Sequence, residues 1–264
     1  MPVLPYTDFS GGRIIPQGLP PAKVASYVPA VIPFNTAAYS ISATTLEQCP
    51  SDTGLEVAFV GRSNAGKSSA INMLTGQHKL ARTSKTPGRT QLLNFFTLGE
   101  NRFLVDLPGF GYAKVPPAMK RKWQQQLERY LRLRKSLKGL VLLMDIRHPF
   151  KDSDETMLTW CLDARLPLHI LLTKSDKLKH GAARAALLQA RKQVAEHADL
   201  VSVQLFSSVT GAGADELRLK LSSWLSAPAE STTSSTTSGT VTDTPAGTAA
   251  AGADVSDDGK QPQG

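Results

Sequence analysis

The sequence is poor in the residues that stabilise exported proteins and in the long apolar stretches that cross membranes. Among its 264 residues it has two cysteines, Cys49 and Cys161, which match no metal-binding spacing. We expect both to remain thiols in a reducing cytoplasm, and a disulfide between them is the alternative. No apolar stretch approaches the length of a membrane span, and the start of the chain lacks the segments of a signal peptide. These absences favour a cytoplasmic protein with no membrane partner.

Composition and charge divide the chain into three parts. Residues 1–36 are rich in proline and are predicted to form a flexible extension. Residues 37–226 hold one set of alternating strand and helix patterns without an internal repeat, which predicts a single domain. Residues 227–264 are mainly Ser, Thr, Ala and Gly, bury too little apolar surface to fold, and are predicted to be disordered. This tail has five acids and one base, a net charge of −4. Because the whole chain carries +8, residues 1–226 carry +12.

The clearest binding pattern lies where an apolar stretch, 55–60, meets Gly61-x-x-x-x-Gly66-Lys67-Ser68. The two glycines let backbone N–H groups turn inward toward a phosphate. Lys67 adds a positive charge for the β- and γ-phosphates, while Ser68 opens a helix and offers its hydroxyl to Mg²⁺. The spacing predicts a nucleotide-binding P-loop made of Gly61, Arg62, Ser63, Asn64, Ala65, Gly66, Lys67 and Ser68.

A second pattern, Asp-x-x-Gly, ends the apolar strand that we predict at 102–107. An aspartate at the end of such a strand lies beside the P-loop, where Asp106 can hold a water of the Mg²⁺ shell. Gly109 can donate its backbone N–H to the γ-phosphate because no side chain obstructs the approach. The pattern is made of Asp106, Leu107, Pro108 and Gly109.

Two further patterns indicate guanine as the base. Asp176 can accept the N1–H and the amino group of guanine together, whereas adenine presents an acceptor at that place. The stem of Lys174 can lie along the purine face. GTPases usually carry Asn where this chain has Thr173, whose hydroxyl can still reach the P-loop. The base-binding residues are predicted to be Thr173, Lys174, Ser175 and Asp176, with Phe206, Ser207 and Ser208 near the guanine oxygen.

The apolar patterns predict an α/β fold. Strands are expected at 37–42, 55–60, 92–98, 102–107, 139–145, 168–173 and 201–206, and helices at 67–75, 117–134, 152–164, 182–197 and 214–225. Strands separated by helices imply right-handed crossovers and a parallel sheet, while the short turn at 99–101 predicts a hairpin. The result is the three-layer fold of P-loop GTPases: a mostly parallel sheet with one antiparallel edge strand and helices on both faces.

Together these motifs resemble those of the EngB group of GTPases, which belongs to one class with Era, EngA, TrmE and the septins. The resemblance covers about residues 37–225 and rests on the patterns at 61–68, 85–91, 94–96, 106–112, 145–149 and 173–176. It implies a monomeric GTPase that acts in assembly of the large ribosomal subunit and is needed for normal cell division and septation.

The resemblance also implies a first switch segment that contacts GTP. Thr90 is implied as a direct Mg²⁺ ligand beside Ser68, with Asp106 bound to the ion through water. Thr83 and Thr86 lie nearby, and the local sequence does not choose among the three threonines. The implied GTP-binding residues of this segment are Gly88, Arg89, Thr90, Gln91 and Leu92.

The residue after Gly109 sets an expectation for catalysis. It is Phe110, where many GTPases carry a glutamine that orients the attacking water, so we expect slow intrinsic hydrolysis. Asn64 matches the asparagine with which related GTPases hold K⁺ near the phosphates, or else it only caps the loop. Arg82 and Arg89 are further candidates. The expected catalytic residues are Lys67, Thr90, Gly109 and Asn64.

Basic residues concentrate in the segment that follows the second switch, which begins at Asp106. Between Tyr112 and Lys138 there are nine bases and one acid, Glu128, where an exposed helix usually interleaves acids. The bases are Lys114, Lys120, Arg121, Lys122, Arg129, Arg132, Arg134, Lys135 and Lys138, and the first switch adds Lys79, Arg82, Lys85 and Arg89. This basic face predicts contact with ribosomal RNA; an ordinary solvated helix is the alternative.

Three classes of function remain open. The first is a GTPase switch on the large ribosomal subunit, and the second is a P-loop ATPase or kinase, against which Asp176 argues. The third is a nucleotide-gated RNA- or ribosome-binding module with negligible turnover, which Phe110 permits.

Overall fold

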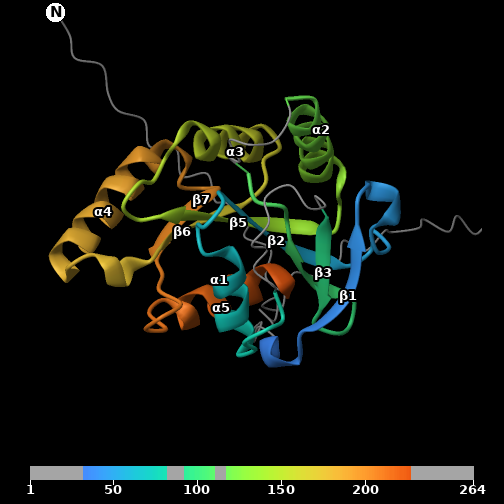
Figure 1. Ribbon diagram of the computed structural model, residues 1–264, viewed down its shortest axis with the longest axis horizontal. Helices are drawn as coiled ribbons and strands as arrows, with labels where there is room; N and C mark the ends of the chain where they lie inside the picture. The colour runs from blue at the N-terminus through green and yellow to red at the C-terminus, as the bar shows by residue number, and fades with distance from the viewer. Residues whose placement is uncertain (1–31, 82–91, 111–116, 227–264) are drawn as a thin grey trace, which may run out of the picture. The chain divides into compact units, whose positions relative to one another are not determined.

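The computed structural model describes residues 32–81, 92–110 and 117–226 (Figure 1). The predictions of a flexible extension and a disordered tail therefore lie almost wholly outside the described residues. In the described part of the chain no helix is both long enough and apolar enough to span a bilayer. Cys49 is half-buried, Cys161 is buried, and both are free thiols, as expected.

Seven strands form one sheet in the order β1-β3-β4-β2-β5-β6-β7. Their bounds are β1 (Ala38–Ala43), β2 (Leu55–Gly61), β3 (Leu93–Thr97), β4 (Arg102–Asp106), β5 (Leu137–Asp145), β6 (Leu168–Thr173) and β7 (Val201–Leu205). The strands from β4 to β7 pair in parallel, whereas β3 is antiparallel to both β4 and β1. The predicted mostly parallel sheet with antiparallel pairing at one edge is confirmed. The reversed strand is next to the edge, because β1 adds to the open side of the hairpin.

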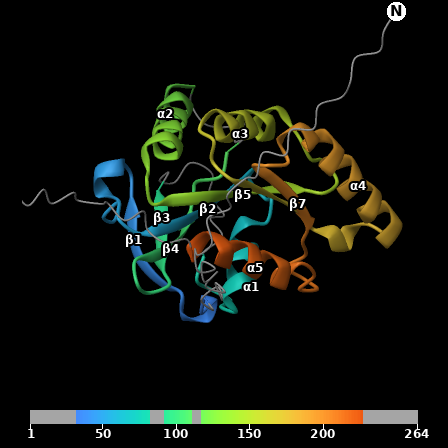
Figure 2. The same cartoon turned by 180° about the vertical axis from the view of Figure 1, so that it is seen from behind.

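The five α-helices of the described residues cover both faces of the sheet. They are α1 (Lys67–Thr75), α2 (Pro117–Leu133), α3 (Asp152–Asp163), α4 (His180–Gln193) and α5 (Ala214–Leu225). Helices α1 and α5 lie on one face, and α2, α3 and α4 lie on the other (Figures 1 and 2). Short 3-10 turns at Phe34–Thr36, Leu46–Gln48, Ser175–Lys177 and Ala195–His197 complete the described elements. The helix predicted at 182–197 begins two residues earlier, at His180, and ends at Gln193. The 3-10 turn Ala195–His197 follows it.

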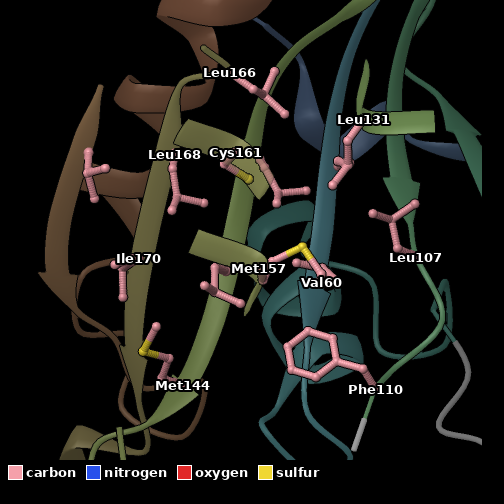
Figure 3. Close-up of a cluster of buried hydrophobic side chains, with 14 of the residues drawn as sticks. Val60, Leu107, Phe110, Leu131, Met144, Met157, Cys161, Leu166, Leu168 and Ile170 are labelled. Carbon is pink, nitrogen blue, oxygen red and sulfur yellow. The ribbon is translucent and has the colours of Figure 1, made fainter. Parts of the chain in front are cut away.

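The central strands are buried on both sides, so apolar residues alternate between two cores. Every residue of β2 is buried, with Val57 and Phe59 in the core under α1 and α5. Val60 belongs to the core under α2, α3 and α4, which also contains Met144 and Met157 (Figure 3). Burial on both faces makes β2 a rigid support for the loop that follows it.

One ion pair interrupts the apolar interior. Glu56 on β2 is fully buried and accepts a hydrogen bond from Arg134 Nε at 3.1 Å and another from Tyr130 Oη at 3.0 Å. Arg134 follows the end of α2, and its side chain is 5% exposed. The pair thus joins the end of α2 to the start of β2.

Candidate nucleotide-binding site

The P-loop links the end of β2 to the start of α1. A Cβ atom on Gly61 would lie 2.8 Å from the Leu143 carbonyl oxygen, so only glycine lets the loop pass this close to β5. Gly66 has φ 95° and Asn64 has φ 64°, both in the left-handed region. These two conformations turn the loop over the first turn of α1, where backbone N–H groups are not used within the helix.

Lys67 and Asp106 meet at the mouth of this loop. The Lys67 ammonium pairs with Asp106 Oδ1, which joins the first residue of α1 to the last residue of β4. Both side chains are mostly buried, at 14% and 9% exposed. The two groups that sequence reasoning assigned to phosphate and to the magnesium shell therefore share one small space.

The backbone of Phe110 is hydrogen-bonded to the P-loop, whereas its ring packs in the hydrophobic core. Its N–H donates to the Gly61 carbonyl at 3.2 Å, and its own carbonyl accepts from the Ser63 N–H at 3.1 Å. Phe110 is 5% exposed and belongs to the core cluster with Val60 and Met157 (Figure 3). A phenyl ring in this position cannot hydrogen-bond a water.

Thr173 connects the base-binding loop to the P-loop. Its hydroxyl is buried and lies 2.7 Å from the Ala65 carbonyl oxygen, which accepts its proton. The Met144 carbonyl lies 3.1 Å away on the other side. The bridge expected from a threonine in place of asparagine is therefore present.

Asp176 is held by the loop after β7. Ser207 Oγ donates to Asp176 Oδ1 at 2.6 Å and accepts from the N–H groups of Val209 and Thr210, each at 3.2 Å. This hydrogen bond lowers the pKa of Asp176, so the carboxylate is ionised at neutral pH and can accept hydrogen bonds from a nucleotide base. The Ser207 N–H donates to the Ala212 carbonyl at 3.0 Å, so Ser208 remains the candidate for the guanine oxygen.

Asp145, at the end of β5, was absent from the predicted site residues and positions one of them. It accepts from Lys174 Nζ at 3.0 Å, from Arg147 Nε at 2.9 Å and from Arg147 Nη2 at 2.6 Å. These cations, with Arg147 first, hold the pKa of Asp145 well below its usual range. Lys174 itself has φ 58°, so the ion pair fixes a side chain on a left-handed residue. The signal in the sequence was an aspartate at a strand end, as for Asp106.

Residues 82–91 of the first switch lie outside the described residues. This applies to the predicted roles of Gly88, Arg89, Thr90 and Gln91, to the alternatives Arg82, Thr83 and Thr86, and to Lys85 of the basic face. Leu92 is described and half-buried just before β3.

The basic face predicted from the sequence has fewer free positive charges than the count of residues suggested. Tyr112 and Lys114 lie outside the described residues, as do the side chains of Lys120 and Lys122. Arg134 faces inward onto Glu56 and cannot belong to this face. Arg129 Nη2 lies 3.7 Å from Glu47 Oε1 and Arg132 Nη1 lies 3.3 Å from Glu128 Oε1, so one acid from a distant segment and one from the same helix offset part of the positive charge.

The sequence is similar to a known protein family and to individual GTP-binding proteins. A family model described as "50S ribosome-binding GTPase" matches residues 56–174. A protein of Vibrio parahaemolyticus described as "Probable GTP-binding protein EngB" is 55% identical over 198 residues, which cover 75% of this chain and 90% of the relative. A protein of Vibrio vulnificus with the same description is 53% identical over 198 residues, with 75% and 91% covered.

Two solved structures share the fold. One, described as a probable GTP-binding protein engB, has a TM-score of 0.53 and 22% identity and covers 64% of this chain and 98% of its own. The other is Era in complex with MgGDPNP and nucleotides of 16S ribosomal RNA, with a TM-score of 0.50, 22% identity and 65% and 57% covered. At these identities the two structures support the fold alone.

Proposed function

This chain belongs to the EngB family of GTP-binding proteins, and from that membership we propose that it is a GTP-dependent switch in assembly of the large ribosomal subunit. The family is one of P-loop GTPases, so the chain binds GTP and hydrolyses it to GDP and phosphate. The observation that carries the ribosomal part is the match of residues 56–174 to a 50S ribosome-binding GTPase model. A cytoplasmic location, a monomeric state and a need for the protein in cell division and septation accompany this proposal.

We assign the nucleotide to the carboxyl ends of β2, β4, β6 and β7. The P-loop holds the phosphates with backbone N–H groups and Lys67, and Asp176 accepts from guanine with Ser207 behind it. The donor set suits Mg²⁺, which prefers oxygen ligands: the Ser68 hydroxyl and the Thr90 hydroxyl directly, and Asp106 through water. Lys67 and Asp106 pair with each other here, and each has the charge to turn instead to phosphate or to the hydrated ion.

The reaction needs positioning and charge stabilisation more than covalent work by the protein. Water attacks the γ-phosphorus, the bond to the β–γ bridging oxygen breaks, and GDP leaves with that oxygen. Lys67 and the Gly109 N–H stabilise the charge on the transferred group. When bound, Mg²⁺ neutralises charge on the β- and γ-oxygens.

Phe110 makes intrinsic turnover slow, because its buried ring leaves the water-orienting role to another group. Two sources fit that role: a K⁺ ion held by Asn64, or a residue supplied by the ribosomal partner. Both predict that a complete reaction depends on conditions outside the folded domain. A nucleotide-gated binding module with negligible turnover is the second candidate, and the same buried ring favours it.

Binding and turnover experiments with purified ribosomal subunits distinguish these candidates. Co-sedimentation with large subunits is expected in a non-hydrolysable GTP analogue and to weaken in GDP, with small subunits as the control. Single-turnover hydrolysis is expected to accelerate when large subunits are added. Lys67→Ala should abolish turnover, whereas Lys135→Ala, an exposed lysine away from the P-loop, should not.

Two results would count against the proposal. Large-subunit association that ignores the nucleotide would remove the switch. Association that follows the nucleotide, together with turnover that stays negligible in K⁺ and with subunits present, would favour the binding module.

A further inference from the structure

Helix α4 and residues 177–179 just before it carry basic side chains without acids among them. From Lys177 to Ala195 the sequence contains no Asp or Glu. The bases in this interval are Lys177, Lys179, Arg184, Arg191 and Lys192, and all five are exposed. An exposed helix without alternating charge gains nothing from ion pairs along its own surface, so the pattern needs another explanation.

The packing of α4 directs these side chains to solvent. Ala183, Ala190 and the following Val194 are buried in the core. The residues at intervals of four from His180, which include Arg184 and Lys192, lie in one row on the exposed side, and Arg191 lies next to that row. Leu188, 59% exposed, is the one large apolar side chain in that row.

Most of this basic charge has no ion-pair partner within the described part of the chain. Lys179, Arg184 and Lys192 form no ion pair there, whereas Lys177 pairs with Asp176, with Nζ and Oδ2 3.5 Å apart. Arg191 donates to the Val203 carbonyl, with Nε at 3.3 Å and Nη2 at 3.2 Å, on the open side of the edge strand β7. By contrast Arg129, Arg132 and Arg134, in and just after α2, each have a glutamate partner.

We propose that the α4 stripe, defined as Lys179, Arg184, Arg191 and Lys192, is a second RNA-contact surface that binds the sugar–phosphate backbone. The proposal rests on the proposed function only in placing the chain on a ribosomal subunit. Arg and Lys on a helix supply the phosphate contacts that position proteins on nucleic acids without reading sequence. A lipid surface fits less well, because an interfacial helix inserts a whole apolar face and α4 uses its apolar residues against the sheet.

The position of the α4 stripe sets its relation to the nucleotide. Helix α4 follows β6 and the base-binding turn Ser175–Lys177, whereas the residues nearest the γ-phosphate come from the ends of β2 and β4. Strands β5 and β6 lie between β2 and β7 in the sheet, and α4 lies at the β7 end (Figure 1). The stripe is therefore expected to bind RNA equally in the GDP and GTP states, unlike a surface built on the switches.

The test is binding of the full chain to a fluorescently labelled RNA hairpin across a range of salt concentrations. The variant is Arg184→Glu with Lys192→Glu. The matched control is Lys151→Glu with Arg165→Glu, which makes the same charge change at exposed residues of other segments. We expect the α4 variant to bind about ten-fold or more weakly near 0.15 M salt, with a log–log salt slope flatter by about 2. Nucleotide affinity and the thermal unfolding midpoint should stay unchanged, and the loss should be equal with GDP and with a GTP analogue.

Three outcomes overturn the proposal. The α4 variant could bind RNA as well as the control, or could weaken only in the GTP state. The variant could also lose binding to phosphatidylserine vesicles while keeping RNA, which would assign the stripe to a membrane. Failure of the proposed function looks different: large-subunit binding would be insensitive to nucleotide while the α4 variant still weakened RNA binding.

Discussion

At the scale of single residues, base selection is assigned to Asp176, whose carboxylate is held by Ser207 Oγ at 2.6 Å. Asp176→Asn replaces one acceptor oxygen with a donor that opposes the guanine amino group. We expect GTP to bind about 100-fold more weakly, as for the loss of about 3 kcal/mol of charged hydrogen bonds, and xanthosine triphosphate to gain. Competition binding with GTP, ATP and xanthosine triphosphate measures this. Asp163→Asn, at an exposed end of α3, is the control, and equal wild-type affinity for ATP and GTP would contradict the assignment.

Asn64 has a conformation that decides how its potassium role should be tested. Because φ is 64°, Asn64→Ala would strain the loop and confuse a catalytic loss with a structural one. Asn64→Gly removes the side chain and tolerates the left-handed backbone. Wild-type turnover is expected to be about ten-fold or more faster in K⁺ than in Na⁺, a part of what a full arginine finger supplies, and the variant should lose this difference.

The control for this comparison is Asn101→Gly, which makes the same change at another left-handed asparagine, in the turn between β3 and β4. It should keep the response to K⁺. If the wild-type rates in the two salts match, Asn64 serves only the shape of the loop.

His169 gives the domain a defined response to acid. Its Nδ1 lies 2.8 Å from Ser202 Oγ and its Nε2 lies 2.8 Å from Gln204 Oε1, and burial lowers the pKa of His169 to about 4. Between pH 6.5 and about 4 the unfolded chain takes up a proton that the folded chain refuses, so this contribution to stability falls as pH falls. His169 accounts for about 3 kcal/mol of that loss.

We expect His169→Gln to make the free energy of unfolding decline less steeply between pH 6.5 and about 4, because glutamine hydrogen-bonds without titrating. Urea unfolding at several pH values measures the slope. His148→Gln, at an exposed position, should leave the slope as in the wild type. An unchanged slope in His169→Gln would assign the acid response to other groups.

At the scale of elements, the join between α2 and β2 depends on a buried ion pair. Burial raises the pKa of Glu56 and the Arg134 guanidinium opposes that rise. Arg134→Met leaves the carboxylate buried without its cation, and we expect a loss of about 3–5 kcal/mol in urea unfolding. Glu56→Leu combined with Arg134→Met should recover part of it, because no charge is then left buried and the remaining loss is the hydrogen bond that Tyr130 Oη donates to Glu56.

The control for the ion pair is Arg132→Met, which breaks an exposed contact with Glu128 and should cost at most about 1 kcal/mol. A loss for Arg134→Met as small as that of the control would contradict the structural role of the buried pair.

At the scale of the whole molecule, charge is divided unevenly along the chain. The tail 227–264 carries −4 while the rest carries +12. Removing the tail raises the net charge from +8 to +12, so binding to the RNA hairpin is expected to hold or strengthen a few-fold at low salt. The difference should vanish near about 0.5 M salt, where charges are screened. Weaker RNA binding, or a lower thermal midpoint, would show that the tail supports the domain instead.

The sequence by itself determined the helices and strands and the order of the nucleotide-binding motifs along the chain. A P-loop is local: a buried strand, two glycines and the start of a helix lie within fifteen residues, so their pattern specifies backbone geometry directly. The central strands could be predicted for a similar reason, because burial on both faces leaves near-continuous apolar runs such as 55–60. The base-binding patterns are equally local, as each is a short stretch at a strand end.

Tertiary structure alone decided which side chains of those elements meet. The inward turn of Arg134 depends on Glu56, far away in the sequence, and the place of β1 depends on the open edge of β3. Asp145 became a partner of Lys174 only because β5 and β6 lie side by side with their ends in register. The α4 stripe likewise differs from α2 only in the folded protein, because glutamates lie beside the arginines of α2 and no acid among the described residues pairs with Arg184 or Lys192. Charge and burial are properties of the folded surface, and a linear count of residues contains neither.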